Sequence, residues 1–171
     1  MEVVYPMENL NRQLLTNGFK FNDDLKIGTK KTLPEKIVQF GEGNFLRAFV
    51  DYMFDEINEQ GLFEGGITLI QPIPGGDFLR NVLNEQEGLY TLIARGREDG
   101  KEVAAKRLIT CVNRCINPYV DLDTYNTCAK NPELRFVVSN TTEAGISWKE
   151  EDMVTDQPQD SFPAKVCNFL Y

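Results

Sequence analysis

The sequence contains no histidine, and this absence excludes several kinds of chemistry. Every Ser-His or Cys-His nucleophile system needs an imidazole base, so none can be built from these 171 residues. Zinc sites draw on closely spaced cysteine and histidine ligands. The four cysteines show no C-x-x-C spacing: Cys111, Cys115, Cys128 and Cys167. The sequence therefore predicts no metal site, and we expect the cysteines to be packing residues.

Positive charge and long apolar runs are also scarce. Lysine and arginine total 18 against 26 acidic residues, a net charge of −8, and the only adjacent basic residues are the pairs Lys30-Lys31 and Lys106-Arg107. Nucleic acid and anionic membranes would repel such a chain. No apolar run approaches the roughly 20 residues that cross a bilayer, and the N-terminus lacks the features of a secretion signal. We therefore expect a cytoplasmic protein with reduced thiols that binds neither nucleic acid nor membrane.

What is present is a strand, a glycine turn and a helix. Residues 36–40 are mainly apolar and are predicted to form a buried strand, and Gly41-Glu42-Gly43 follows. From Asn44 to about Gln60, apolar residues recur at helical spacing, and Gly61 stands where a C-terminal cap is expected. The apolar face predicted for this helix consists of Phe45, Ala48, Phe49, Met53, Phe54 and Ile57.

The remaining chain alternates short apolar strands with helices. We expect a strand at 67–70, a loop at 71–77, a helix at 78–86 that Asp77 caps, a hairpin of 89–96 with 102–112 around Asp99-Gly100, a helix at 118–130, a strand at 134–140 and a helix from Ser161. This order predicts an α/β protein with a doubly wound, mostly parallel sheet and a β-hairpin insertion. Residues 1–35 are expected to form an N-terminal arm, and residues 36–171 a partial nucleotide-binding domain.

The glycine turn has the pattern of a phosphate-binding loop. Gly41 permits the tight turn, Gly43 allows a diphosphate to approach the backbone, and the helix N-terminus supplies free N–H groups. The G-x-G-x-x-G fingerprint is incomplete because Leu46 occupies its third position. The acidic residue expected after the second strand is also displaced, with Gln71 at that place and Asp77 beyond it. On spacing alone, an ordinary α/β turn and an S-adenosylmethionine methyltransferase remain alternatives.

Three blocks of sequence resemble the long-chain mannitol dehydrogenase family. "FGEGNFLRAFVDYMFDEIN" is similar to its N-terminal G-x-G-x-F-x-R-A-[FH] signature, "LNEQEGLYTLIARG" to its second block and "VSNTTEAGI" to its third. The residues that match the signature are Gly41, Gly43, Phe45, Arg47 and Ala48. Phe49, "QP" after the second strand and "SNTTEAGI" most resemble the branch that acts on sugar acids.

The resemblance implies a Rossmann-like, NAD-binding domain followed by a large helical domain that carries a catalytic lysine. This chain would end before the helical domain, so no residue in it is assigned a catalytic role, and the chain alone is expected to have no turnover. The implied reaction is the interconversion of D-altronate and D-tagaturonate, with a small sugar acid as the partner. A fructuronate- or mannitol-type polyol dehydrogenase and a non-catalytic nucleotide-binding module are alternatives. Nothing in the sequence specifies an oligomeric state.

The expected cofactor-binding residues come from three places in the chain. Gly41 and Gly43 are expected at the pyrophosphate, with the backbone N–H groups of Asn44 and Phe45 beside them. Arg47 is expected either to contact phosphate or to pair with Asp51, four residues further along the helix.

The other expected positions follow strands. Gln71 is expected beside the adenosine ribose, and Asn140, Thr141 and Thr142 at the nicotinamide ribose, because ligands bind at the carboxyl ends of parallel strands. Glu143 is expected to assist proton movement, to hold a residue of the helical domain, or to cap the turn that follows.

Overall fold

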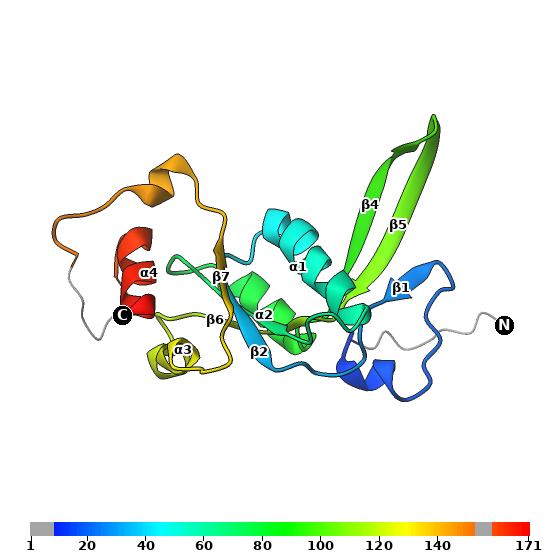
Figure 1. Ribbon diagram of the computed structural model, residues 1–171, viewed down its shortest axis with the longest axis horizontal. Helices are drawn as coiled ribbons and strands as arrows, with labels where there is room; N and C mark the ends of the chain where they lie inside the picture. The colour runs from blue at the N-terminus through cyan, green and yellow to red at the C-terminus, as the bar shows by residue number, and fades with distance from the viewer. Residues whose placement is uncertain (1–8, 153–158) are drawn as a thin grey trace.

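The computed structural model describes residues 9–152 and 159–171, so part of the expected N-terminal arm, residues 1–8, lies outside the described residues. The chain forms two sheets and the helices packed around them (Figure 1). The elements, in chain order, are η1 (Arg12–Leu15), β1 (Leu25–Ile27), β2 (Glu35–Phe40), α1 (Asn44–Glu59), β3 (Gly66–Ile70), α2 (Asp77–Glu85), β4 (Tyr90–Glu98), β5 (Lys101–Ile109), β6 (Val112–Ile116), α3 (Leu122–Ala129), β7 (Phe136–Ser139), η2 (Glu143–Ile146) and α4 (Phe162–Leu170). Within these described elements, no helix combines the length and the apolar character needed to cross a membrane.

The larger sheet has four strands, all parallel, in the order β6-β3-β2-β7. Val38 in β2 pairs with Thr68 on one side and with Val137 on the other. The chain therefore builds outward from β2 through β3 to β6, and then returns across the sheet to place β7 on the free edge of β2. This order, with the helical connections, confirms the predicted doubly wound, Rossmann-like fold.

Side chains alternate between two apolar layers, as expected for strands covered on both faces. On one face, Ile37 and Leu69 pack toward α1 and α2, in a cluster that includes Leu83. On the other face, Val38 and Phe40 pack toward α3 and α4, in a cluster that includes Tyr125 and Phe169. All the strands of this sheet end at the same edge.

The smaller sheet has the order β1-β5-β4. Strands β4 and β5 form the predicted hairpin, which projects from the body of the molecule (Figure 1). Asp99 and Gly100 both have positive φ, 51° and 77°, as a two-residue hairpin turn requires. The N-terminal segment adds β1 parallel to β5, a pairing that the sequence analysis did not predict.

Several predicted boundaries differ from the structure. Residues 102–112 were predicted as one strand, but β5 ends at Ile109 and the chain then enters the other sheet as β6. Asp77 is not the cap of α2, because Gly76, with φ of 74°, holds that position and Asp77 lies in the first turn. The predicted helix at 118–130 is the shorter α3, capped by Asp121. Ser161 caps α4 as predicted.

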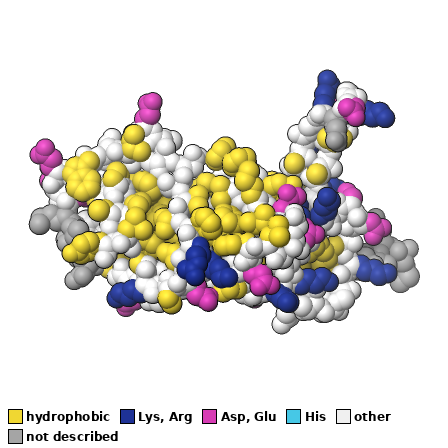
Figure 2. All heavy atoms as spheres, in the orientation of Figure 1, with side chains coloured by type: hydrophobic (Ala, Val, Ile, Leu, Met, Phe, Trp, Pro, Cys, Tyr) yellow, Lys and Arg dark blue, Asp and Glu magenta, His cyan; other side chains and the backbone are white. Residues whose placement is uncertain are grey.

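The predicted apolar face of α1 was largely wrong. Phe45, Phe49 and Met53 are 61%, 50% and 47% exposed. Figure 2 shows apolar side chains gathered across the middle of the face on which α1 and β7 lie. The buried side of α1 instead carries Leu46 and three polar residues, Asp51, Asp55 and Asn58.

Asp55 connects α1 to the segment between β5 and β6, where the chain passes from the smaller sheet to the larger one. Its carboxylate accepts hydrogen bonds from the backbone N–H groups of Thr110 (2.8 Å) and Cys111 (3.0 Å), from the Thr110 hydroxyl (3.0 Å) and from Arg107 Nε (2.6 Å). Arg107 is also bound by Glu59, at 2.7 Å, on the next turn of α1. Asp55 is fully buried, whereas the Glu59 side chain is 49% exposed.

Removing Asp55 should therefore destabilise the protein far more than removing Glu59. Asp55→Ala leaves Arg107 Nε and two backbone N–H groups buried without an acceptor, and we expect a loss of about 3–5 kcal/mol in the free energy of unfolding. Glu59→Ala, the matched control, removes an exposed partner of the same arginine and should cost about 0.5 kcal/mol. Urea denaturation of both variants measures the difference, and similar losses would contradict this account of the junction.

Candidate functional site

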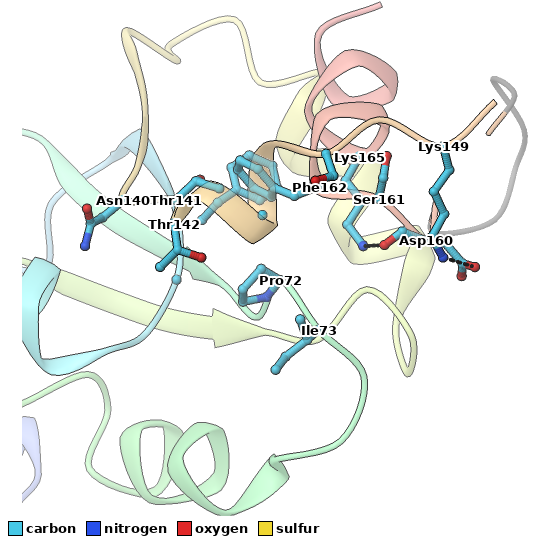
Figure 3. Close-up of a pocket in the computed structure, with 14 residues that line it drawn as sticks. Pro72, Ile73, Asn140, Thr141, Thr142, Lys149, Asp160, Ser161, Phe162 and Lys165 are labelled. Atoms are coloured by element: carbon cyan, nitrogen blue, oxygen red, sulfur yellow. Dashed lines mark hydrogen bonds and ion pairs between the residues drawn. The ribbon is translucent and has the colours of Figure 1, made fainter. Parts of the chain in front are cut away.

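A cavity of about 400 Å³ lies at the edge where the strands of the larger sheet end. The cavity opens beside β2. From β2 the chain continues to β3 on one side and later returns to β7 on the other side, so the strand order reverses at β2. Open α/β sheets bind ligands at such switch points. Figure 3 shows Pro72 and Ile73 on one side of the cavity, Asn140, Thr141 and Thr142 on a second, and Ser161, Phe162 and Lys165 on a third.

The turn after β2 carries the two glycines for different reasons. Gly41 has φ of +118°, and its N–H donates to Ile70 O at 2.9 Å, so the backbone itself requires glycine there. Gly43 caps α1 with φ of −67° and ψ of 159°, values open to any residue. No described atom would lie within 4 Å of a Cβ on Gly43. The chain therefore gives no internal reason for glycine at position 43, which faces open space at the N-terminus of α1.

The first turn of α1 holds the glycine turn through Arg47. Arg47 Nε donates to Glu42 O at 2.8 Å, and Nη2 donates to Asn44 Oδ1 at 2.5 Å. Its guanidinium lies 5.2 Å from the centre of the Tyr90 ring. Of the two roles expected for Arg47, the ion pair with Asp51 is absent from the described contacts, because the guanidinium hydrogen bonds go to the turn. Asn44 and Phe45 are exposed at the helix N-terminus.

Gln71 lies at the end of β3, where the sequence analysis expected it, but its amide faces inward. The side chain is 1% exposed, and Nε2 donates to the carbonyls of Ile73 (3.0 Å) and Gly75. These bonds shape the loop that carries Pro72 and Ile73 into the cavity wall. Asp77, the first acidic residue after Gln71 in the sequence, accepts a hydrogen bond from Asn117 at 3.0 Å and forms an ion pair with Arg80 at 3.4 Å.

The segment after β7 forms the opposite wall. The Thr141 hydroxyl donates to Ser139 Oγ at 3.4 Å, and Thr142 begins the 3₁₀ turn η2, where its carbonyl accepts from Gly145 N at 2.9 Å. Asn140, Thr141 and Thr142 all line the cavity. The structure thus brings these three residues together with Gly41, as the sequence analysis expected, while Gln71 lies behind the wall rather than in it.

Sequence reasoning missed the third wall, which α4 supplies. Lys165 is only 4% exposed; its Nζ donates to Asp160 O at 2.7 Å and lies 5.6 Å from the centre of the Tyr119 ring. Burial lowers the pKa of Lys165. Phe162 packs edge-on against Phe40, with ring centres 5.6 Å apart. The available signal was a single charged residue, the lysine, within the mostly apolar stretch "FPAKVCNFLY".

Solved structures share this architecture. Mannitol 2-dehydrogenase of Pseudomonas fluorescens, solved as a ternary complex with NAD and D-mannitol, superposes with a TM-score of 0.68 at 24% identity, over 80% of this chain and 27% of that one. A D-sorbitol dehydrogenase in substrate-free form gives a TM-score of 0.69 at 20% identity, over 83% of this chain and 29% of that one. Identities this low establish the fold alone.

Sequence comparison identifies closer relatives. The altronate oxidoreductase of Yersinia enterocolitica is 51% identical over 139 residues, and that of Bacillus subtilis 46% identical over 138 residues. Each match covers 81% of this chain but only 28% of the relative, so the chain spans less than a third of the length of these proteins. The family model of the mannitol dehydrogenase Rossmann domain matches residues 35–169. The chain therefore belongs to the mannitol dehydrogenase family, through its Rossmann domain.

Proposed function

We propose that this chain binds NAD across the carboxyl ends of β2, β3 and β7, as the cofactor-binding part of an oxidoreductase. The observation that carries the proposal is Gly43, which neither the backbone conformation nor any described neighbour requires to be glycine. A ligand that must approach the backbone closely explains it, because a side chain at this position would occupy the space of a diphosphate.

The residues expected to bind the cofactor have distinct roles in this proposal. The free N–H groups at the start of α1, at Asn44 and Phe45, hold the pyrophosphate together with the positive end of the helix dipole. Arg47 keeps the turn in shape and adds positive charge. Gln71 acts indirectly, by fixing the loop beside the adenosine ribose, and Asn140, Thr141 and Thr142 face the nicotinamide ribose.

NAD is the proposed cofactor because the P. fluorescens mannitol 2-dehydrogenase, which shares the fold, was solved with it. When bound, the nicotinamide supplies or accepts a hydride. The residues of this chain bind and orient it and close one side of the reaction space.

For the whole protein we propose the interconversion of D-altronate and D-tagaturonate. Identities of 46–51% to altronate oxidoreductases support this substrate over mannitol or sorbitol, whose dehydrogenases are only 20–24% identical. The relatives extend far beyond the matched segment, and we assign the group that handles the substrate proton to that remaining part.

A valine at position 43 tests the cofactor site. Gly43→Val should raise the dissociation constant for NADH at least about tenfold, because the side chain fills the space of the pyrophosphate, while changing the free energy of unfolding by only about 1 kcal/mol. Calorimetric titration with NADH, NADPH and S-adenosylmethionine measures the affinities. Gly96→Val is the matched control, since a Cβ there also meets nothing within 4 Å but lies on the β4–β5 hairpin.

Unchanged NADH affinity in Gly43→Val would overturn the assignment of the turn. Binding of S-adenosylmethionine alone would favour a methyltransferase and refute the dehydrogenase proposal.

The chain by itself should bind cofactor without turnover. Cofactor positioning alone supplies no proton donor for the keto oxygen of tagaturonate, so we expect NADH oxidation with tagaturonate to stay at the level of a protein-free control. Following NADH absorbance at saturating tagaturonate measures this. Steady consumption of NADH by the 171-residue chain would show that the site described here is catalytically complete.

A further inference from the structure

The hydroxyl of Tyr90 lies between two oxygen acceptors beneath the glycine turn. It is 2.9 Å from the carbonyl of Arg47, in the first turn of α1, and 2.8 Å from Asp51 Oδ2. A phenol carries a single hydrogen, so it can donate to only one of them. If Asp51 is ionised, one of these two close oxygen pairs has no hydrogen between its atoms.

The surroundings of Asp51 are poor in donors. Its side chain is fully buried, and Oδ1 has no partner among the described residues. Asp55, on the same face of α1, contrasts with it: Asp55 accepts four hydrogen bonds, one of them from an arginine. A buried carboxylate without a cation or several donors is costly to ionise.

Charged and titratable groups approach Asp51 from three sides. On α1 these are Arg47, whose guanidinium hydrogen bonds go to the turn, and Asp55, whose negative charge opposes ionisation. Tyr90 approaches from β4, and Cys111, from the β5–β6 passage, donates to the backbone carbonyl of Asp51 at 3.3 Å. The uncharged amide of Gln39 approaches from β2. Burial outweighs the favourable contacts and raises the pKa of Asp51 to about 7.

We propose that Asp51 is a neutral carboxylic acid in the folded protein, and that its proton orders the hydrogen bonds that position the first turn of α1 for an anionic ligand. Asp51 donates from Oδ2 to the Tyr90 oxygen, and Tyr90 donates to the carbonyl of Arg47. Both short contacts then contain a hydrogen.

The consequence for the ligand rests on the proposed function. Ionising Asp51 places a negative charge below the N-terminus of α1 and opposes the positive end of the helix dipole, which attracts a diphosphate. Asp51 is thus a positioning residue: its neutral form favours the anionic cofactor, and cofactor binding in turn favours the proton.

Stability against pH tests the proton without any ligand. The carboxyl has an ordinary pKa of 3.8 when unfolded and about 7 when folded. Between these values the folded state holds a proton that the unfolded state has released, so stability falls as pH rises toward 7. Asp51→Asn has the same shape and no proton to lose. Its melting temperature relative to wild type should therefore rise from pH 5 to pH 8.

The control is Asp123→Asn, which removes the same charge from an exposed position on α3. Its melting temperature relative to wild type should be nearly constant over this range. An Asp51→Asn difference that is equally constant would overturn the proposal.

Infrared difference spectra of wild type against Asp51→Asn at pH 6 detect directly whether the Asp51 carboxyl group is protonated. We expect the carbonyl band of a protonated carboxylic acid in the wild type, and Tyr90→Phe, which keeps the ring and removes the hydroxyl, should shift that band. A spectrum with only a carboxylate band at pH 6 would overturn the proposal even if one of the variants fails to fold.

NADH titrations at pH 6 and pH 8 test the link to the ligand. The wild-type dissociation constant should rise about fivefold at pH 8 and that of Asp51→Asn should change much less. Equal rises in both would overturn the positioning role. Failure of NADH to bind any variant at either pH would refute the proposed cofactor and its positioning by Asp51, while the infrared and stability measurements still decide whether Asp51 carries the proton.

Discussion

The architecture depends on how one buried carboxylate holds the point where the chain leaves one sheet for the other. Strand β5 belongs to the sheet of the hairpin and β6 to the parallel sheet, and only Thr110 and Cys111 separate them. Asp55 binds the backbone N–H groups of both residues and the guanidinium of Arg107, so α1 fixes the angle between the two sheets. Because α1 also begins at the glycine turn, the same helix connects this junction to the proposed cofactor site. A disturbance at Asp55 would reach the turn through a rigid element.

The polar residues on the buried side of α1 form hydrogen bonds that apolar residues could not form. Asn58 exchanges two hydrogen bonds with the backbone of Gly65, at 2.8 and 2.9 Å, and so holds the approach to β3. Asp55 anchors the junction, and Asp51 meets Tyr90 beneath the first turn. Buried polar groups are costly unless they are paired, and the partners of Asp55 and Asn58 include backbone groups that lie between strands and helices. The glycine turn is therefore supported from below by specific bonds as well as by packing.

Much of the fold was predictable because short apolar strands and the turn signals between them are local features. The strand, glycine turn and helix at 36–60, the Asp99-Gly100 hairpin and the Ser161 cap were all predicted close to their observed positions. Strand β6 was missed because no glycine or proline separates it from β5, and only tertiary packing sends it to the other sheet. The orientation of α1 was missed for a related reason. Its aromatic residues suggested an apolar buried face. Asp55 and Asn58 are buried instead, because nearby buried backbone groups need hydrogen-bond partners.

The parallel order of the larger sheet also constrains when the protein can fold. The central strand β2 is made early, yet one of its two neighbours is β7, which pairs Phe136 with Ile37. During synthesis one edge of β2 remains unpaired until residue 139 has emerged from the ribosome. Such non-local pairings slow folding and leave an apolar strand open to incorrect partners in the meantime. The walls that follow β7 and belong to α4 are thus assembled after the wall that follows β3, so we expect ligand binding to be acquired late in synthesis.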